Sequence, residues 1–268
     1  KYSNQIKKFF KSKKNKIKLI IHAAAQPSHD WAKDHVEIDA EVNFISTLNL
    51  LKFTQKYCPK AIFIFLSTNK VYGDNPNKLK FFKTKTRWEP SLKKYRTKGI
   101  SENFNLDNCV HSFFGVSKCA ADLLAQEYGK NYNLKVGIFR AGCITGPNHS
   151  GAKLHGFLSY LVKCVSNNKK YNIIGHEGKQ VRDNIHSYDL VKCFWYFFKK
   201  PRYGEVYNIG GGMTSNCSVI EVINFLKDKY NFKPKLKYIK KNRTGDHIWW
   251  ISDLSKFKKH YPKWKQKY

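Results

Sequence analysis

Residues 61–73 read AIFIFLSTNKVYG, six apolar residues followed at once by polar ones and a glycine. An uninterrupted apolar run of this length is typical of a strand that is buried on both faces of a parallel sheet. Residues 17–25 read IKLIIHAAA, in which branched apolar residues run into small ones, and they indicate a second buried strand. Between these two stretches, residues 36–57 have the spacing of apolar residues that predicts a helix.

The same alternation continues along the chain. The sequence predicts a helix over about 114–132, a strand over 135–139, a short strand over 206–209 and a helix that begins near Ser218. Between 142 and 178 it predicts loops and one helix. Buried strands that alternate with helices predict an α/β fold with a doubly wound parallel sheet and helices on both faces.

The composition excludes some classes of protein. With 268 residues, of which 41% are hydrophobic, the chain can bury a substantial core, which excludes a disulfide miniprotein and a wholly disordered chain. The formal net charge of +31 favours a polyanionic ligand and raises the hypothesis of a nucleic-acid-binding protein. The lysines are spread along the whole length, however, and none of the recognised nucleic-acid motifs is present. We therefore expect no nucleic-acid partner.

Seven cysteines form an odd set without a Cys-x-x-Cys pair, and no metal-ligand spacing is present. We therefore expect no disulfide framework, no metal site and a reducing, cytoplasmic compartment. The longest apolar runs fall far short of the ~20 residues that a membrane-spanning helix needs, so we expect no membrane contact. The lysine-rich first residues lack the apolar region and cleavage site of a secretory signal.

Three predicted strand ends carry residues that suit a ligand site, because ligands of open parallel sheets bind beyond the carboxyl ends of the strands. They are residues 22–26 (HAAAQ), 67–73 (STNKVYG) and 140–143 (RAGC). Small residues after a strand let a ligand approach the backbone, and hydroxyls and a lysine there cost free energy unless they are bonded or solvated. The alternatives are tight helix packing for the first stretch and an ordinary capped turn for the second.

Residues 67–73, followed by FGVSK at 114–118, resemble the active-site pair of the extended short-chain dehydrogenase/reductase family and its NAD-dependent epimerases and dehydratases. That family carries a Ser or Thr after one strand and a Tyr-x-x-x-Lys at the start of the next helix. Further matches in the family's order are His22–Ala25, Asn43 with 47–51 (TLNLL), 178–183 (GKQVRD), 207–211 (YNIGG) and 243–246 (RTGD). Within the family, HAAAQ and STNKVYG look most like the CDP-tyvelose (CDP-paratose) 2-epimerases.

The resemblance implies a Rossmann-type fold and a reaction in which tightly held NAD takes a hydride from a carbon of a nucleotide-linked sugar and returns it to the other face. By position, Thr68 would hydrogen-bond the reacting hydroxyl, and Lys118 would hold the nicotinamide ribose. Arg182 and Arg243 match arginines that clamp the substrate diphosphate, and Asp246 would lie near the nucleotide ribose. The alternative for these three is a surface ion pair. The remaining candidates by resemblance are Ala23, Ala24, Ala25, Asn43 and Ala141 for the cofactor and Cys143 for the substrate.

Two features depart from the family's pattern. The tyrosine of Tyr-x-x-x-Lys is Phe114, which has no proton to exchange, so acid–base catalysis cannot pass through it. Tyr72 and His111 are the nearest candidates in the sequence, although each better suits a structural role. The chain also lacks the Gly-x-x-Gly-x-x-Gly turn whose backbone cradles the NAD pyrophosphate. Because the chain opens in what resembles the helix before the family's fourth strand, we expect an N-terminally incomplete fold that lacks about two βα units of ~30 residues each.

The resemblance leaves several hypotheses open. The first is an NAD-dependent nucleotide-sugar epimerase, and the second is a catalytically silent protein that binds a nucleotide sugar or a dinucleotide. A third is a 4-epimerase or dehydratase, because pocket shape rather than the shared motifs sets the carbon that reacts. We expect a dinucleotide-binding domain over 1–140 that also receives about 179–211, a smaller substrate-binding lobe over 141–178 and 212–268, and a homodimer.

Overall fold

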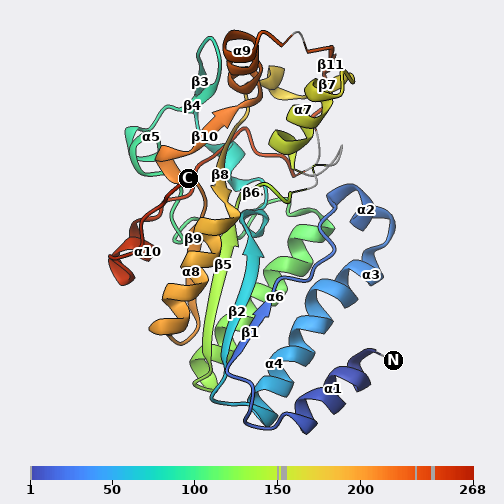
Figure 1. The fold of residues 1–268 in the computed structure, drawn as a ribbon, viewed down its shortest axis with the longest axis vertical. Coiled ribbons are helices and arrows are strands. Elements are labelled where there is room, and N and C mark those ends of the chain that lie inside the picture. Colours follow the sequence, from blue (N-terminus) through green and yellow to red (C-terminus); the bar gives the residue numbers. More distant parts are fainter. Residues whose placement is uncertain (1, 150, 152–155, 233, 243–244) are drawn as a thin grey trace.

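The computed structural model describes residues 2–149, 151, 156–232, 234–242 and 245–268. Its core is a four-stranded parallel sheet in the order β1-β2-β5-β9 (Figure 1). The strands are β1 (Leu19–His22), β2 (Ile62–Thr68), β5 (Lys135–Ala141) and β9 (Glu205–Ile209). The parallel sheet that the alternating pattern predicts is confirmed. The bounds of β2, β5 and β9 lie close to the predicted ones, whereas β1 is shorter than the predicted range 17–25.

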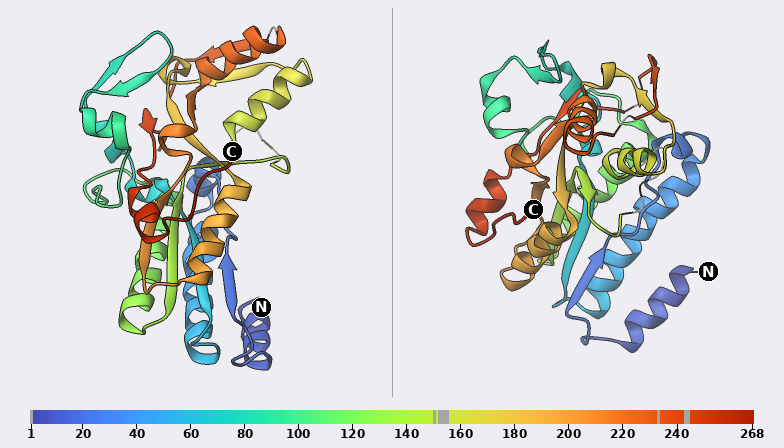
Figure 2. Two further views of the ribbon diagram at one scale, coloured as in Figure 1. Left: turned by 60° about the vertical axis from the view of Figure 1, so that its left-hand side comes forward. Right: turned by 45° about the horizontal axis from the view of Figure 1, so that its top comes forward.

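Helices cover both faces of this sheet (Figures 1 and 2). They are α4 (Ser46–Tyr57) and α6 (Ser112–Asn131) on one face, and α8 (Ser187–Lys199) and α10 (Ser255–His260) on the other. The alternation of side chains along β2 explains the two layers. Phe63 and Phe65 belong to the apolar cluster under α4 and α6, whereas Ile62 and Ile64 belong to the cluster under α8 and α10. The uninterrupted apolar run is therefore buried on both sides, as expected.

The helix predicted over 36–57 is present in three consecutive parts. They are α3 (Val36–Ala40), a π-helical turn η1 (Glu41–Ile45) and α4. The π turn carries Asn43, whose side chain is buried. Such turns inside α-helices are found frequently at functional sites. Asn43 therefore occupies an irregular position that the apolar spacing of the sequence does not reveal.

Shorter elements form a second layer beyond the carboxyl ends of the parallel strands (Figures 1 and 2). A second sheet has the order β10-β8-β12, and β6 also pairs with β8. Its strands are β6 (Cys143–Thr145), β8 (Val181–His186), β10 (Asn216–Ser218) and β12 (Trp249–Trp250). Around it lie the pair β7 (Tyr171–Ile174) and β11 (Leu236–Ile239), the pair β3 (Phe81–Lys83) and β4 (Trp88–Pro90), and the helices α5 (Lys93–Lys98), α7 (Phe157–Ser166) and α9 (Val219–Tyr230). The remaining elements are α1 (Tyr2–Ser12), α2 (His29–Asp34) and the 3-10 turns η2 (Asn69–Tyr72), η3 (Asn75–Lys78), η4 (His176–Gly178) and η5 (Gly212–Thr214).

The expectation of loops and one helix over 142–178 is wrong in one respect, because β6 and β7 accompany α7 there. Strands of three or four residues carry no periodicity that a sequence could reveal. The predicted domain boundary stays a prediction. Of the range 179–211, β9 completes the parallel sheet, whereas β8 pairs within the second sheet.

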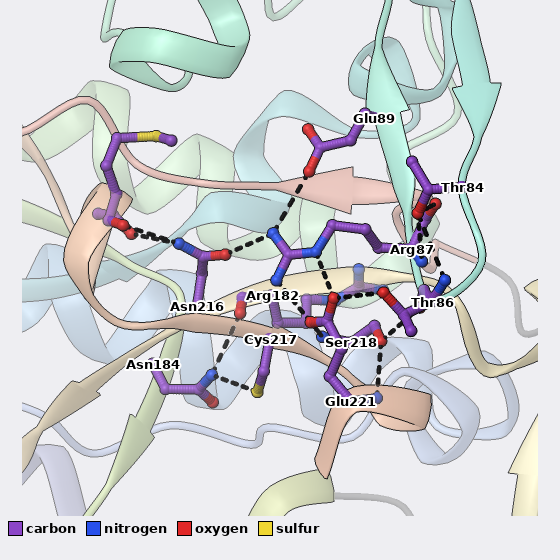
Figure 3. Close-up of polar contacts among 12 residues, drawn as sticks. Thr84, Thr86, Arg87, Glu89, Arg182, Asn184, Asn216, Cys217, Ser218 and Glu221 are labelled. Atoms are coloured by element: carbon purple, nitrogen blue, oxygen red, sulfur yellow. Dashed lines mark hydrogen bonds and ion pairs between the residues drawn. The ribbon is translucent and has the colours of Figure 1, made fainter. Parts of the chain in front are cut away.

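An arginine fixes the β3–β4 pair to the N-terminus of α9 (Figure 3). Arg87 donates from Nε to Glu221 Oε1 at 2.6 Å and from Nη1 to Asn216 Oδ1 at 2.9 Å. Glu221 also takes part in a capping box, in which Ser218 Oγ accepts the Glu221 backbone N–H at 3.1 Å. One guanidinium thus joins the β3–β4 pair, the second sheet and α9.

A buried ion pair joins five elements at the carboxyl end of the parallel sheet. Arg140 in β5 donates from Nε and Nη2 to the carboxylate of Asp122 in α6, at 3.0 and 2.8 Å. Asp122 also accepts a hydrogen bond from Ser67 Oγ in β2 at 2.5 Å, and Arg140 Nη1 donates to Tyr72 Oη in η2 at 2.9 Å. Tyr72 in turn donates to Asn208 Oδ1 in β9 at 2.9 Å. Both charged side chains are almost inaccessible, so each depends on the other for its neutralisation.

The substitution Asp122→Asn leaves the buried charge of Arg140 without a counterion, so we expect the free energy of unfolding to fall by about 3–5 kcal/mol. Urea unfolding followed by circular dichroism measures the change. The matched control is Glu127→Gln in the same helix, whose carboxylate lies 3.8 Å from Lys130 Nζ with both side chains more than half-exposed. The control should lose less than about 1 kcal/mol. Equal losses in the two variants would contradict the role of the buried pair.

Candidate active site

A cavity of about 590 Å³ lies where the carboxyl ends of the parallel strands meet the second layer. Residues that follow β1, β2 and β5 contribute to its wall, together with residues of β7 and β8. Five of the site residues expected from the sequence line it: Thr68, Phe114, Cys143, Arg182 and Asp246. Residues that are far apart in the sequence therefore share one cavity.

Of the other expected site residues, those that the structure describes do not line this cavity. Lys118, Asn43 and Ala141 are buried beside it or below it in the fold, whereas Ala23–Ala25 are exposed. Arg243 lies outside the residues that the structure describes.

The end of β2 holds a hydroxyl and an ammonium group. Thr68 Oγ1 accepts the Lys70 backbone N–H at 3.2 Å and so caps η2. Lys118 reaches from α6 to the same strand, where Nζ donates to the Leu66 carbonyl at 2.9 Å and lies 4.3 Å from the centre of the Phe65 ring. Both functional groups are thus fixed within the last residues of one strand.

Burial determines the charge of the groups below the cavity. It lowers the pKa of Lys118 to about 8 from the ordinary 10.5, against the opposing effect of Asp122 and Asp39. Burial, assisted by the charge of Lys118, also lowers the pKa of His22 to about 4. His22 is therefore neutral near pH 7, and its Nε2 shares a hydrogen bond of 2.8 Å with Thr47 Oγ1. A neutral imidazole here avoids a second positive charge beside the lysine.

Arg182 places a positive charge on the cavity wall. Its Nη1 donates to the Val181 carbonyl at 2.7 Å, and its Nη2 donates to Asp246 Oδ1. The alternative of an ion pair is therefore realised, but the pair lines the cavity instead of the open surface. Cys143 lies in the same wall, and burial raises the pKa of its thiol to about 11, so the sulfur is uncharged near pH 7.

Asn43 holds the segment that follows β1. Its Oδ1 accepts the Gln26 backbone N–H at 3.0 Å, while Nδ2 donates to Asp39 Oδ1 and to Ser117 Oγ, both at 3.1 Å. Because these bonds use both polar atoms of the amide, Asn43 positions residues 23–26 and does not present its amide to a ligand.

The structure has residues suited to bind one end, the nicotinamide end, of the dinucleotide that the resemblance implies. The small, exposed side chains of Ala23–Ala25 leave the backbone accessible beyond the carboxyl end of β1. Lys118 lies in the neighbouring helix, with its ammonium group at the end of β2. These residues fit the nicotinamide ribose. The sequence of this chain contains no Gly-x-x-Gly-x-x-Gly turn, so the fit concerns that end of the dinucleotide alone.

Phe114 lines the cavity, and neither of the acid–base candidates expected from the sequence does so. Tyr72 is fully buried, its hydroxyl belongs to the Arg140 network, and burial raises its pKa to about 12. His111 Nε2 donates to the Leu106 carbonyl at 2.8 Å. Both residues therefore have structural roles.

Four titratable residues of the cavity were not among the expected site residues: His29, Lys70, His149 and Tyr171. His29 opens α2, a helix of six residues with Ser28 as its N-cap, which is too short to show a periodicity. Tyr171 lies on β7, one of the short strands that the sequence does not predict. Lys70 could have been predicted as a site residue, because it lies directly after the predicted end of a buried strand.

In the part of the chain that the structure describes, no helix is both long and apolar enough to cross a membrane. Nor does any group of three or more His, Cys, Asp or Glu side chains within the same part come together in a way that could hold a metal ion.

The lowered pKa of Lys118 predicts a pH-dependent stability. Between pH 8 and 10.5 the unfolded chain binds a proton that the folded chain lacks, so the free energy of unfolding rises with pH in this window. Relative to Lys118→Met, the wild-type protein should gain about 3 kcal/mol from pH 7.5 to pH 10.5, as measured by urea unfolding. The control is Lys130→Met, a change at an exposed lysine of the same helix. A pH-independent difference between wild type and Lys118→Met would contradict the prediction.

The model of the NAD dependent epimerase/dehydratase family matches residues 2–210. A CDP-paratose 2-epimerase of Salmonella typhi is 30% identical over 243 residues, which cover 88% of this chain and 69% of that protein. A dTDP-D-glucose 4,6-dehydratase of Dictyostelium discoideum is 31% identical over 204 residues, which cover 74% of this chain and 42% of that protein. The chain thus spans well under the full length of either relative.

Solved structures share the fold. A UDP-glucose 4-epimerase of Thermotoga maritima, crystallised with UDP-glucose, has a TM-score of 0.78 at 24% identity and covers 99% of this chain and 76% of that one. The dTDP-glucose 4,6-dehydratase DesIV of Streptomyces venezuelae, crystallised with NAD, has a TM-score of 0.76 at 19% identity and covers 99% of this chain and 72% of that one. The expected Rossmann-type α/β fold is confirmed.

Proposed function

The chain belongs to the NAD dependent epimerase/dehydratase family, and from this premise we propose that it epimerises a nucleotide-linked sugar in the manner of a CDP-paratose 2-epimerase. The observation that carries the proposal is the single cavity of about 590 Å³ that Thr68, Phe114 and Arg182 line together. Its volume suits a small ligand, and its wall combines apolar surface with a few polar groups, as ligand sites do.

The residues of the cavity and those buried or exposed beside it would have different roles, according to their chemistry. NAD, when bound, supplies the reversible removal and return of a hydride at one sugar carbon. Lys118 would hold the nicotinamide ribose through its ammonium group. Because the pKa of this group is about 8, a fraction of it is uncharged at physiological pH. The Thr68 hydroxyl would donate a hydrogen bond to the reacting oxygen of the sugar. Ala23–Ala25, Asn43 and Ala141 shape the cofactor side without charge.

Arg182 would bind the diphosphate that links sugar and nucleotide. A guanidinium offers two parallel donors to phosphate oxygens, which makes it the side chain best suited to this task. Arg243 has the same role by resemblance. Asp246, which is paired with Arg182, would face the nucleotide ribose, and the neutral thiol of Cys143 would contact the substrate without competing for its charge.

Phe114 is the observation that favours a second candidate function. A ring without a hydroxyl has no proton to exchange, and a protein that retains the binding residues but lacks an acid–base group would bind a nucleotide sugar without converting it. The catalytically silent binding protein is therefore the alternative. The experiment below separates it from an epimerase.

The test supplies the purified protein with NAD and CDP-paratose and follows inversion at carbon 2 by NMR. Parallel reactions contain UDP-glucose and dTDP-glucose, which are the substrates of a 4-epimerase and a 4,6-dehydratase. Inversion of CDP-paratose supports the proposal. Conversion of either other sugar replaces it with another reaction of the family. If calorimetry detects binding but no sugar is converted, the silent binding protein is correct.

Arg182→Ala should weaken nucleotide-sugar binding and leave the fold intact. A charge-assisted hydrogen bond contributes about 1.5–3 kcal/mol, so the Kd for CDP-paratose should rise about 10- to 150-fold in calorimetry. The matched control is Arg87→Ala, because Arg87 is likewise ion-paired and largely shielded from solvent but does not line the cavity. Similar losses of affinity in both variants would show that Arg182 acts through stability alone.

We retain the expected homodimer and the two-lobed division of the chain as predictions. Two stripes of exposed apolar side chains support the dimer. One follows α6 through Phe113, Val116 and Leu123, and the other follows α3 and η1 through Ile38 and Val42. The two helical segments that carry these side chains pack side by side (Figure 1).

A further inference from the structure

An imidazole lies directly beside the ring that stands where the family has its tyrosine. The centres of the His29 and Phe114 rings are 4.8 Å apart, and the rings meet edge to face at 67°. His29 comes from α2 and Phe114 from α6, and both line the cavity together with Thr68. A group that can exchange a proton is therefore present next to the position where the hydroxyl is missing.

Two helices fix the orientation of the His29 ring. Its Nδ1 shares a hydrogen bond of 2.8 Å with Ser112 Oγ at the start of α6. Ser112 has a left-handed backbone with φ of 62°, and its Oγ also accepts the Gly115 backbone N–H at 3.3 Å. At the other end, Ser28 caps α2 by accepting the Trp31 backbone N–H at 3.2 Å. The hydrogen bond to Ser112 thus fixes the plane of an imidazole that lines the cavity and can exchange a proton with a ligand there.

The glycine that packs over this ring supports the same arrangement. A Cβ on Gly245 would lie 3.2 Å from His29 Nδ1 and 3.3 Å from Cε1, and its φ of 70° is a conformation that side chains rarely adopt. The backbone at 245 therefore passes close to one edge of the imidazole. Lys70 Nζ donates to the Gly245 carbonyl at 2.8 Å and holds the backbone there.

The other titratable groups of the cavity are less suited to this task. Asp246 is paired with Arg182, and Lys70 is a cationic donor to a backbone carbonyl. The Cys143 thiol stays protonated, and His149 is bonded through Nδ1 to Ser159 Oγ at 2.9 Å on the α7 side of the cavity. Tyr171 packs in the apolar cluster of α7 and α9, where its ring contacts that of Tyr160. His29 is the titratable side chain whose ring contacts Phe114.

We propose that His29 is the proton-transferring residue of this site in place of the tyrosine, an inference that rests on the epimerisation proposed above. In the first half of the reaction the O–H proton of the sugar would pass to the His29 imidazole, while the hydride of the same carbon would pass to NAD⁺, the oxidant that the proposed function supplies. The sugar is thereby oxidised to a ketone and the nicotinamide is reduced. In the second half the hydride returns to the opposite face, and His29 gives the proton back to the oxygen, so nothing is consumed.

A base must be unprotonated to accept the proton, so we expect kcat to fall on the acid side of the pH profile. The charged residues that line the same cavity as His29 are Lys70 of η2, Arg182 of β8 and Asp246 of the loop before β12.

His29→Gln keeps a hydrogen-bonding side chain at the site but cannot exchange a proton. We expect kcat for CDP-paratose to fall by about 10²- to 10⁴-fold, with KM changed less than about threefold and the acid limb of the pH profile lost. His29→Ala serves as the second variant. His35→Gln is the matched control, because His35 is an exposed histidine at the other end of α2 that does not line the cavity.

A rescue experiment tests the role directly. In the His29→Gln background, Phe114→Tyr should raise kcat at least about tenfold above that of His29→Gln alone, because it returns a hydroxyl to the place beside position 29. Retention of more than a third of the wild-type kcat by folded His29→Gln and His29→Ala would overturn the proposal, as would the absence of any rescue. Wild-type protein that converts no sugar at all would instead overturn the proposed function.

A binding measurement without NAD gives a readout that does not depend on turnover. In two-dimensional NMR of histidine-labelled protein, added CDP-paratose should shift the imidazole signals of His29 and leave those of His35 unchanged. His29→Gln should bind CDP-paratose with a Kd within about threefold of wild type. If CDP-paratose binds but the His29 signals do not move, His29 does not contact the substrate and the proposal is wrong.

Discussion

The bidentate pair between Arg140 and Asp122 is the interaction on which the arrangement of the site depends. It ties β5 to α6, and through Ser67 and Tyr72 it extends to β2 and η2. The same segments present Thr68 at the end of β2 and carry Phe114 and Lys118 on α6. Because two buried charges hold each other in a medium of low dielectric constant, the pair demands one geometry and so sets the register of helix and strands. The shape of the cavity therefore depends on the Arg140–Asp122 pair.

The position of Lys118 shows a conflict between stability and chemistry at this site. An ammonium group buried between Phe65 and the Leu66 carbonyl destabilises the fold. The lowering of its pKa to about 8 has the same cause, the loss of solvation of the charged form. A methionine would pack there without that cost. His22 beside the lysine is neutral near pH 7, so the local electrostatics accommodate one buried positive charge and not two.

The sequence predicts the parallel sheet well because the signals for β2 and the helix at 36–57 are long and apolar. It predicts that Thr68 and Arg182 share a cavity only through the family resemblance, since spacing alone does not bring residues 114 positions apart together. It does not reveal β6 and β7, which are too short for a periodicity, nor the π turn at Asn43. It also misses His29, because the contact of that ring with Phe114 is made by tertiary packing between α2 and α6.

The pairing of Arg182 with Asp246 has a consequence for how a ligand would leave. The carboxylate acts as a resident counterion, so an arriving diphosphate exchanges one anion for another at the guanidinium and gains less than it would from a bare charge. In the proposed reaction, Asp246 would compete for Arg182 once the product has formed and so would lower the barrier to its dissociation. A wall that carries its own replacement anion binds substrate less tightly but releases product sooner, which keeps the site open for the next molecule.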